Sequence, residues 1–118
     1  MTIEADLFTT LNGLVGGRMY PDDAPNGAAL PYITYTQIGG DVVRYTEAAV
    51  PPTKNGLFQF NVWGATRTVC SALILQIEAA LVTSSVFQTE PQGAFDSVRD
   101  FDMDLRGARQ VFSIWSVR

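Results

Sequence analysis

Hydrophobic residues recur at helical spacing in two segments of the chain. The first segment is close to the N-terminus and carries Ile3, Leu7, Phe8, Leu11 and Leu14. This spacing places them on one face of a helix, which Thr2 can cap and a glycine cluster at positions 13, 16 and 17 can end. The second segment follows a turn over residues 64–68. Its predicted inner face consists of Val69, Leu73, Ile77, Ala80 and Leu81.

Alternating and β-branched segments between the helices predict strands. Residues 32–38 are rich in tyrosine, threonine and isoleucine, and Gly39-Gly40 can form a hairpin turn to a returning strand over residues 41–47. Residues 57–63 alternate most clearly, with Phe58, Phe60 and Val62 on one side. The chain therefore pairs neighbouring strands before it enters the second helix.

The C-terminal part of the sequence is also predicted to be β-structure. Residues 86–89 can form a short strand, and residues 95–105 and 109–117 are typical of a final hairpin centred on Gly107. The order of helix, strands, helix and strands indicates an α+β fold. We expect a single domain over residues 1–118, with a mainly antiparallel β-sheet and two helices packed on it.

Two proline-containing loops are predicted, over residues 19–31 and 48–55. The prolines stiffen these loops, and long loops in compact domains usually have a function. Stiff loops lose less entropy when they dock on a partner. We expect contacts with other subunits or with a partner structure at Tyr20, Pro21, Asp22, Asp23, Pro51, Pro52, Thr53 and Lys54.

The composition restricts the partners. Charged residues make up 17% of the chain and the net charge is −4, without any run of basic residues. Binding to phosphates of nucleic acid or to anionic lipid is therefore disfavoured. No apolar stretch is suited to span a membrane, and the acidic N-terminus differs from a signal peptide, so we expect assembly in a cytoplasm. The low charge fits either an uncharged polar surface or a surface buried against other subunits.

The residue types of the chain give little support for a catalytic site. The chain has no histidine and one cysteine, which excludes Ser–His and Cys–His pairs and zinc sites built from thiolates. We expect no enzymatic activity, no cofactor and no metal. Asp100, Asp102 and Asp104 alternate with apolar residues. They could form a calcium loop, although the glycine and glutamate of an EF-hand are missing, or an acid–base pair, or one polar face of a strand. The alternation favours the strand.

Four segments, in order, resemble one family. They are LNGLVGGRMYP from Leu11, LPYITY from Leu30, FNVWGAT from Phe60 and FSIW from Phe112. Together they are similar to the tail-completion, or tail-terminator, proteins of long-tailed bacteriophages and related prophage-derived particles. The resemblance implies an α+β structural protein that forms a ring, typically of six copies. The ring would cap the tail tube at the head-proximal end of the virion tail and join it to the head connector.

The resemblance also implies the partners. These are further copies of the chain, the tail tube protein and a head-completion or connector protein, with assembly in the host bacterium. DNA would pass through the ring without specific binding. Apart from the resemblance, we expect Asp100, Asp102 and Asp104 on a solvent-facing strand surface, which in such a ring would face the lumen. The alternative from another class is a small monomeric ligand-binding domain, with Tyr32, Tyr35 and Trp63 around a pocket.

Overall fold

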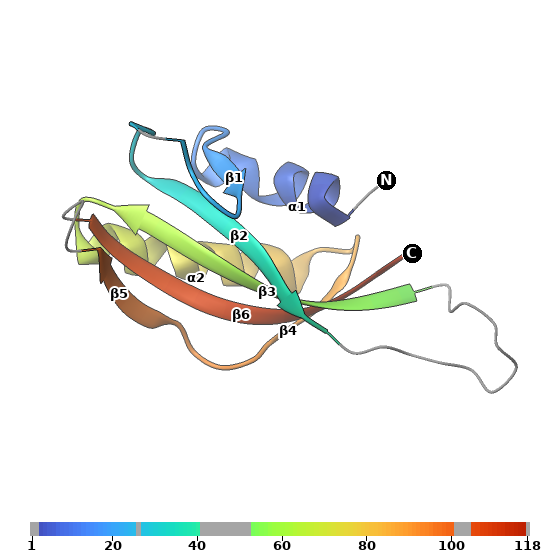
Figure 1. The fold of residues 1–118 in the computed structure, drawn as a ribbon. Helices are drawn as coiled ribbons and strands as arrows, with labels where there is room; N and C mark the ends of the chain where they lie inside the picture. The colour runs from blue at the N-terminus through green and yellow to red at the C-terminus, as the bar shows by residue number, and fades with distance from the viewer. Residues whose placement is uncertain (1–2, 26, 41–52, 101–104, 118) are drawn as a thin grey trace, which may run out of the picture.

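The computed structural model describes residues 3–25, 27–40, 53–100 and 105–117. It contains two α-helices and six β-strands, in an α+β arrangement (Figure 1). The helices are α1 (Ile3–Leu11), continued by a single 3₁₀ turn η1 (Asn12–Leu14), and α2 (Arg67–Thr83). The strands are β1 (Met19–Pro21), β2 (Tyr32–Gly39), β3 (Thr53–Gly64), β4 (Gln88–Pro91), β5 (Asp96–Asp100) and β6 (Leu105–Val117).

The six strands form one sheet around a long central pair. The strand order is β1-β2-β3-β6-β4, and β5 also pairs with β6. Strands β3 and β6 are antiparallel along the whole of β3, from Thr53 opposite Val117 to Gly64 opposite Arg106. All pairs are antiparallel except β1 with β2. The predicted fold class, a mainly antiparallel sheet with two helices packed on it, is confirmed.

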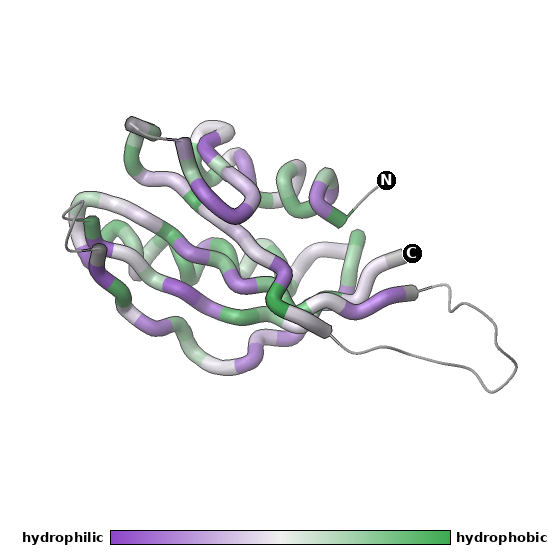
Figure 2. Tube along the Cα trace, viewed as in Figure 1, coloured by the Kyte–Doolittle hydropathy of each residue, from purple (hydrophilic) through white to green (hydrophobic). Residues whose placement is uncertain are grey.

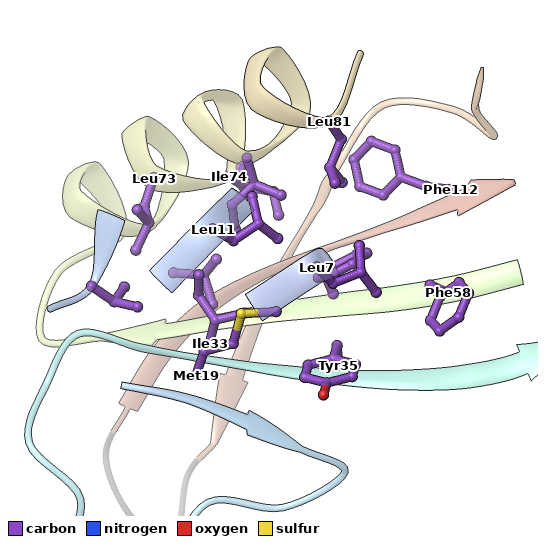
Figure 3. Packing of buried hydrophobic residues seen from close by; sticks show 14 of the residues in the cluster. Leu7, Leu11, Met19, Ile33, Tyr35, Phe58, Leu73, Ile74, Leu81 and Phe112 are labelled. Atoms are coloured by element: carbon purple, nitrogen blue, oxygen red, sulfur yellow. The ribbon is translucent and has the colours of Figure 1, made fainter. Parts of the chain in front are cut away.

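The core lies between the helices and one face of the sheet. Phe58, Phe60 and Val62 of β3 point into it, as the alternation of the sequence predicted. The ring of Phe60 is fully buried, and its centroid lies 6.1 Å from that of Tyr35 and 5.6 Å from that of Phe112. Leu7 and Leu11 of α1 pack into the same cluster as residues of α2 (Figure 3). This aromatic and aliphatic cluster fixes the helices to the sheet.

The helices differ from prediction at a few positions. Helix α2 begins at Arg67, inside the predicted turn, because the Thr66 hydroxyl accepts a hydrogen bond from the Val69 amide and caps it. Val69 was predicted on the inner face but is 44% exposed. Positions four apart drift by about 40° around a helix, so Val69 is about 120° from Leu81. Phe8, also predicted on an inner face, is 40% exposed.

The first three residues of the loop predicted over residues 19–31 form a strand, so this part of the prediction was wrong. Met19–Pro21 is strand β1, which pairs in parallel with residues 33–35 of β2. In the part of the chain that the structure describes, its partner strand begins more than ten residues further along the sequence. Local sequence therefore gives little sign of it. The predicted loop over residues 48–55 also ends too late, because β3 begins at Thr53.

The predicted hairpins change as well. Asp100 pairs with Leu105, and Gly107 lies inside β6 opposite Val98, so the prediction of a hairpin centred on Gly107 was wrong. The short strand expected over residues 86–89 is instead β4, Gln88–Pro91. The returning strand predicted over residues 41–47 lies outside the described residues. Strand β2 pairs with β3 in the described part of the chain. Neither α1 nor α2 is long and apolar enough to cross a membrane.

Candidate assembly surfaces

One face of the sheet carries the helices and the opposite face is uncovered by them (Figure 1). The alternation of hydrophilic and hydrophobic positions along β3 and β6 is visible in Figure 2. The strand register places Tyr32 beside Trp63, Thr34 beside Asn61 and Thr36 beside Gln59 on the uncovered face. We call this the open sheet face. Its residues on β2, β3 and β6 are Tyr32, Thr34, Thr36, Leu57, Gln59, Asn61, Trp63, Arg109, Val111, Ser113 and Trp115.

The open sheet face is poor in charge. Among its residues, Arg109 is the one that is charged at neutral pH, and it is exposed; the others are half-buried apart from Thr34, which is buried. Gln59 and Asn61 bond to each other along β3, with Nε2 of Gln59 3.4 Å from Oδ1 of Asn61. Arg109 lies opposite Asn61 in the pairing of β6 with β3, and its Nε is 3.7 Å from Oδ2 of Asp96 on β5. Large aromatic side chains without charge are typical of the centre of a protein interface.

A groove of about 420 Å³ runs between the open sheet face and the loop after β1. Tyr32, Asn61 and Trp63 line it on the sheet side, while Asp22 and Asp23 line it on the side of the loop. The loop is held at both ends. The Asp22 amide donates to the Tyr35 carbonyl at 2.8 Å, and Nε of Arg18 donates to the Pro31 carbonyl at 2.9 Å. These hydrogen bonds hold the loop beside the sheet, and two carboxylates line the loop side of the groove.

A second surface with little charge is the outward side of α2. Apart from Arg67 at the N-terminus of the helix, its exposed residues, which we call the uncharged α2 face, are Thr68, Val69, Ala72, Leu75, Gln76, Ala79, Val82 and Thr83. Leu75 and Val82 are about half exposed. The one carboxylate of α2, Glu78, accepts a 3.0 Å hydrogen bond from Gln110 of β6. The sequence prediction missed this surface because it placed Val69 inside. The near absence of charge over residues 68–83 was the available signal.

The predicted contact residues near β1 follow one another along the chain, and two of them, Asp22 and Asp23, line the groove. Tyr20 is half-buried, with its ring centroid 6.1 Å from that of Tyr32 in an edge-to-face contact. Pro21 ends β1, and Pro21, Asp22 and Asp23 are exposed. The other predicted group is separate. Pro51 and Pro52 lie outside the described residues, Thr53 opens β3, and Lys54 is half-buried in β3 opposite Ser116.

The predicted aspartate cluster is described only at its first residue. Asp100 ends β5, where its backbone pairs with Leu105 of β6. Asp102 and Asp104 lie outside the described residues. Leu105, the last residue of the segment predicted over residues 95–105, belongs to the next strand, β6, and lines the groove. The prediction of one continuous strand through the aspartates and Leu105 was therefore wrong.

The residues proposed for a ligand pocket do not converge. Tyr32 and Trp63 share the open sheet face, but Tyr35 points into the core, where it stacks on Phe60. An odd separation along a strand puts Tyr32 and Tyr35 on opposite faces. The structure thus separates the three side chains on which the ligand-binding alternative depended.

The described residues offer little reactive chemistry. Burial raises the pKa of the Cys70 thiol, whose Sγ donates to the Arg106 carbonyl at 3.2 Å. Burial, with a smaller contribution from the carboxylates of Glu4 and Asp22, raises the pKa of Tyr35. No cluster of three or more metal-binding side chains occurs in the described parts of the chain. The charge-poor faces are therefore the features that suggest a function.

Comparison with known families supports an assembly role. The family described as "Tail completion protein gp17" matches residues 8–116. Because the match covers most of the chain, the protein belongs to this family, and it is a structural protein of a bacteriophage tail. The resemblance seen in the sequence is thereby confirmed. The comparison with curated proteins finds no match.

Two solved structures share the fold. One is a chain from "Virion of native gene transfer agent (GTA) particle", with a TM-score of 0.63 and 18% identity. The alignment covers 98% of this chain and 95% of that one. Another solved chain has a TM-score of 0.50 and 12% identity, over 99% of this chain and 97% of its own length. At such low identity these matches show a common fold.

Proposed function

We propose that the protein forms a ring on the head-proximal end of the phage tail tube and joins the tail to the head connector. Membership of the tail completion family is the observation that carries this proposal. The ring would contain six copies, as the resemblance to tail terminators implies. Its partners are further copies of the chain, the tail tube protein and a head-completion or connector protein, which assemble in the host cytoplasm.

The physical basis of a ring is a head-to-tail contact. Such a contact uses two different patches of the same subunit, and repeated rotation closes the ring. A stable contact buries at least about 1,000 Å² in total. Strands β1 and β4 are the ends of the strand order, and their outer backbone groups can pair with a neighbouring chain. The uncharged α2 face adds apolar area.

Several finer assignments belong to the same proposal. Tyr20, Pro21, Asp22 and Asp23 would contact a neighbouring copy or the tail, as would the segment from Pro51 to Lys54. Asp100, Asp102 and Asp104 would face the lumen, where negative charge repels DNA phosphates at short range and lets DNA pass without sticking. An enzymatic role is not part of the proposal.

The test is to produce particles that lack this protein and to image them. We expect complete heads and separate tails, and joined particles after the wild-type protein is supplied. Labelled protein on isolated tails should appear as a ring at one end, the end that meets the head. Label at the opposite end, or one copy per tail, would refute the proposal.

A further inference from the structure

We propose that the groove beside β1 binds an arginine side chain on an extended segment of another protein of the tail or the connector. The inference rests on the proposed function for the identity of this partner, and it adds the chemical group that the groove recognises. The two carboxylates on the loop side of the groove would pair with the guanidinium group. The aromatic rings on the sheet side would pack against it.

The charge at the groove is negative. Asp22 and Asp23 line it on the side of the loop, and both residues are exposed. Among the described residues that line the groove, none is basic. The arginine of the open sheet face, Arg109, is not part of this lining, and its Nε is 3.7 Å from Oδ2 of Asp96. The lining therefore carries an uncompensated negative charge, which attracts a cation.

Aromatic and aliphatic side chains line the rest of the groove. Tyr32 and Trp63 are direct neighbours across β2 and β3, and both are half-buried. Leu30 and Leu105 line the groove as well. A guanidinium group is planar and weakly hydrated, so it packs on aromatic rings, while the methylene stem of arginine covers aliphatic carbon. A lysine ammonium holds its water more strongly and cannot pair with a carboxylate through two parallel hydrogen bonds, so the lining favours arginine.

The carboxylates stand on a loop whose backbone is tied down. The Asp22 amide donates to the Tyr35 carbonyl at 2.8 Å, and the Asp23 amide donates to the Pro21 carbonyl at 2.7 Å. In the described part of the chain, neither carboxylate makes a hydrogen bond or an ion pair of its own. Both are therefore held beside the groove and available to a guanidinium group, and little order has to be created when it binds.

The size of the groove suits one large side chain with the backbone that carries it. Its volume of about 420 Å³ is in the lower part of the range of about 300–1,000 Å³ that is usual for ligand pockets. Tyr20 and Pro21, which the sequence also predicts as contact residues, directly precede the two aspartates. A partner segment laid along the groove would therefore meet the exposed Pro21 at the end of β1.

A second copy of this chain is a less favourable occupant than a basic segment of another protein. The chain carries a net charge of −4, and like charges that meet at an interface cost binding energy. The uncharged α2 face offers no cation to the groove. An arginine on another protein meets opposite charge and aromatic area in one place. Arginine, tyrosine and tryptophan are also the residue types enriched at the centres of interfaces.

Titration of the isolated protein with a short peptide tests the groove. The probe is the tripeptide Ala-Arg-Ala with both ends capped, and the readout is the NMR signal of each tryptophan indole N–H. Trp63 lines the groove, whereas Trp115 lies eight residues along β6 from the partner of Trp63, or about 26 Å away at 3.3 Å per residue. We expect the Trp63 signal to shift with a Kd on the order of 1 mM and the Trp115 signal to stay in place.

Two further peptides separate charge from shape. Citrulline has the shape of arginine without its charge, and its peptide should bind at least about tenfold more weakly. The lysine peptide should bind more weakly than the arginine peptide, because the ammonium group lacks the planar fork. No shift of Trp63 with the arginine peptide would overturn the inference, and so would equal affinity for the citrulline peptide.

A neutralised variant tests the two carboxylates. Asp22→Asn with Asp23→Asn keeps the size of both side chains, and asparagine tolerates the left-handed conformation of position 22. We expect the affinity for the arginine peptide to fall at least about tenfold, with an unchanged melting temperature because both positions are exposed. Glu90→Gln, at an exposed position of β4 outside the groove, is the matched control and should bind normally. Normal binding by the double asparagine variant would refute the site.

Photo-cross-linking in assembled particles identifies the occupant. The photoreactive residue p-benzoylphenylalanine would replace Leu30, which lines the groove and is 38% exposed. Mass spectrometry should find it joined to an arginine-containing segment of another tail or connector protein. A cross-link to a second copy of this chain, to DNA or to a segment without arginine would overturn the inference, as would no cross-link, while the proposed function survives. If electron microscopy shows no ring on tails, the proposed function fails and the partner with it, whereas the peptide titration still decides whether the groove binds arginine.

Discussion

The indole ring of Trp63 lies against the backbone of Gly107 on the neighbouring strand. A β-carbon added at Gly107 would stand 2.8 Å from Cε3 of Trp63 and 2.8 Å from the carbonyl oxygen of Val62. The two residues are direct partners in the pairing of β3 with β6. The glycine therefore lets the tryptophan lie close to the sheet, where its side chain lines the groove.

We predict that Gly107→Ala destabilises the protein by about 1–3 kcal/mol, because the new methyl group cannot fit without moving a backbone carbonyl or the indole. The measurement is urea unfolding followed by circular dichroism. Gly13→Ala is the control, since a β-carbon there meets no atom within 4 Å. Equal stability of the Gly107 variant and the control would show that Trp63 is not held against this strand.

The centre of the core is Phe60. Its side chain is fully buried between Tyr35, Phe58 and Phe112. We predict that Phe60→Ala lowers the free energy of unfolding by about 3–5 kcal/mol, through lost burial and the cavity left behind. Thr9→Ala, at an exposed position of α1, should change it by less than about 0.5 kcal/mol. A loss below about 1 kcal/mol at Phe60 would contradict the described core.

Asp22 adopts a left-handed backbone conformation, with a φ of 62°. This conformation costs a non-glycine residue about 1–2 kcal/mol, and a β-branched residue more. We predict that Asp22→Gly is at least as stable as the native protein and that Asp22→Val is less stable by at least about 1 kcal/mol. Thermal unfolding measures both. Asp23→Val should be neutral, and a similar loss at both positions would indicate that side-chain chemistry, rather than φ, matters.

The buried Tyr35 predicts a loss of stability in alkali. Its pKa in the folded protein lies above the ordinary value of 10.0, because of burial first and then the carboxylates of Glu4 and Asp22. Above pH 10.0 the folded state therefore holds more protons than the unfolded state, and the free energy of unfolding falls as pH rises until the folded pKa is passed. Urea titrations of Tyr35→Phe and native protein should diverge only in that range. Parallel curves would contradict the raised pKa.

Cys70 should react slowly in the folded protein. Its side chain is fully buried, and its pKa is raised by burial, so the reactive thiolate is scarce. We predict that a maleimide reagent labels the native chain much more slowly than the chain in denaturant. Mass spectrometry at fixed times measures both rates. Equally fast labelling would mean that the N-terminal part of α2 opens readily.

Local patterns were sufficient for the existence of the main elements. The stripe of Ile3, Leu7 and Leu11 predicted α1, and the alternation of Phe58, Phe60 and Val62 predicted the central strand with the correct face inward. These assignments succeeded because a helix and a strand each impose a short repeat that burial of one side makes visible in the sequence. The family resemblance also came from the sequence, through ordered segments that span the chain.

The errors occurred where distant segments meet. The pairing of β1 with β2 decides where a strand begins, and the pairing of β5 with β6 decides where a hairpin turns. Gly107 was mistaken for a turn residue, whereas a glycine is needed there because Trp63 of the neighbouring strand lies against its backbone. Likewise, the candidate surfaces required knowing which sheet face the helices cover. The sequence by itself determined the repeat of each element, since that depends on near neighbours. Only the tertiary structure decided which faces stay uncovered, since that depends on packing between residues far apart in the chain.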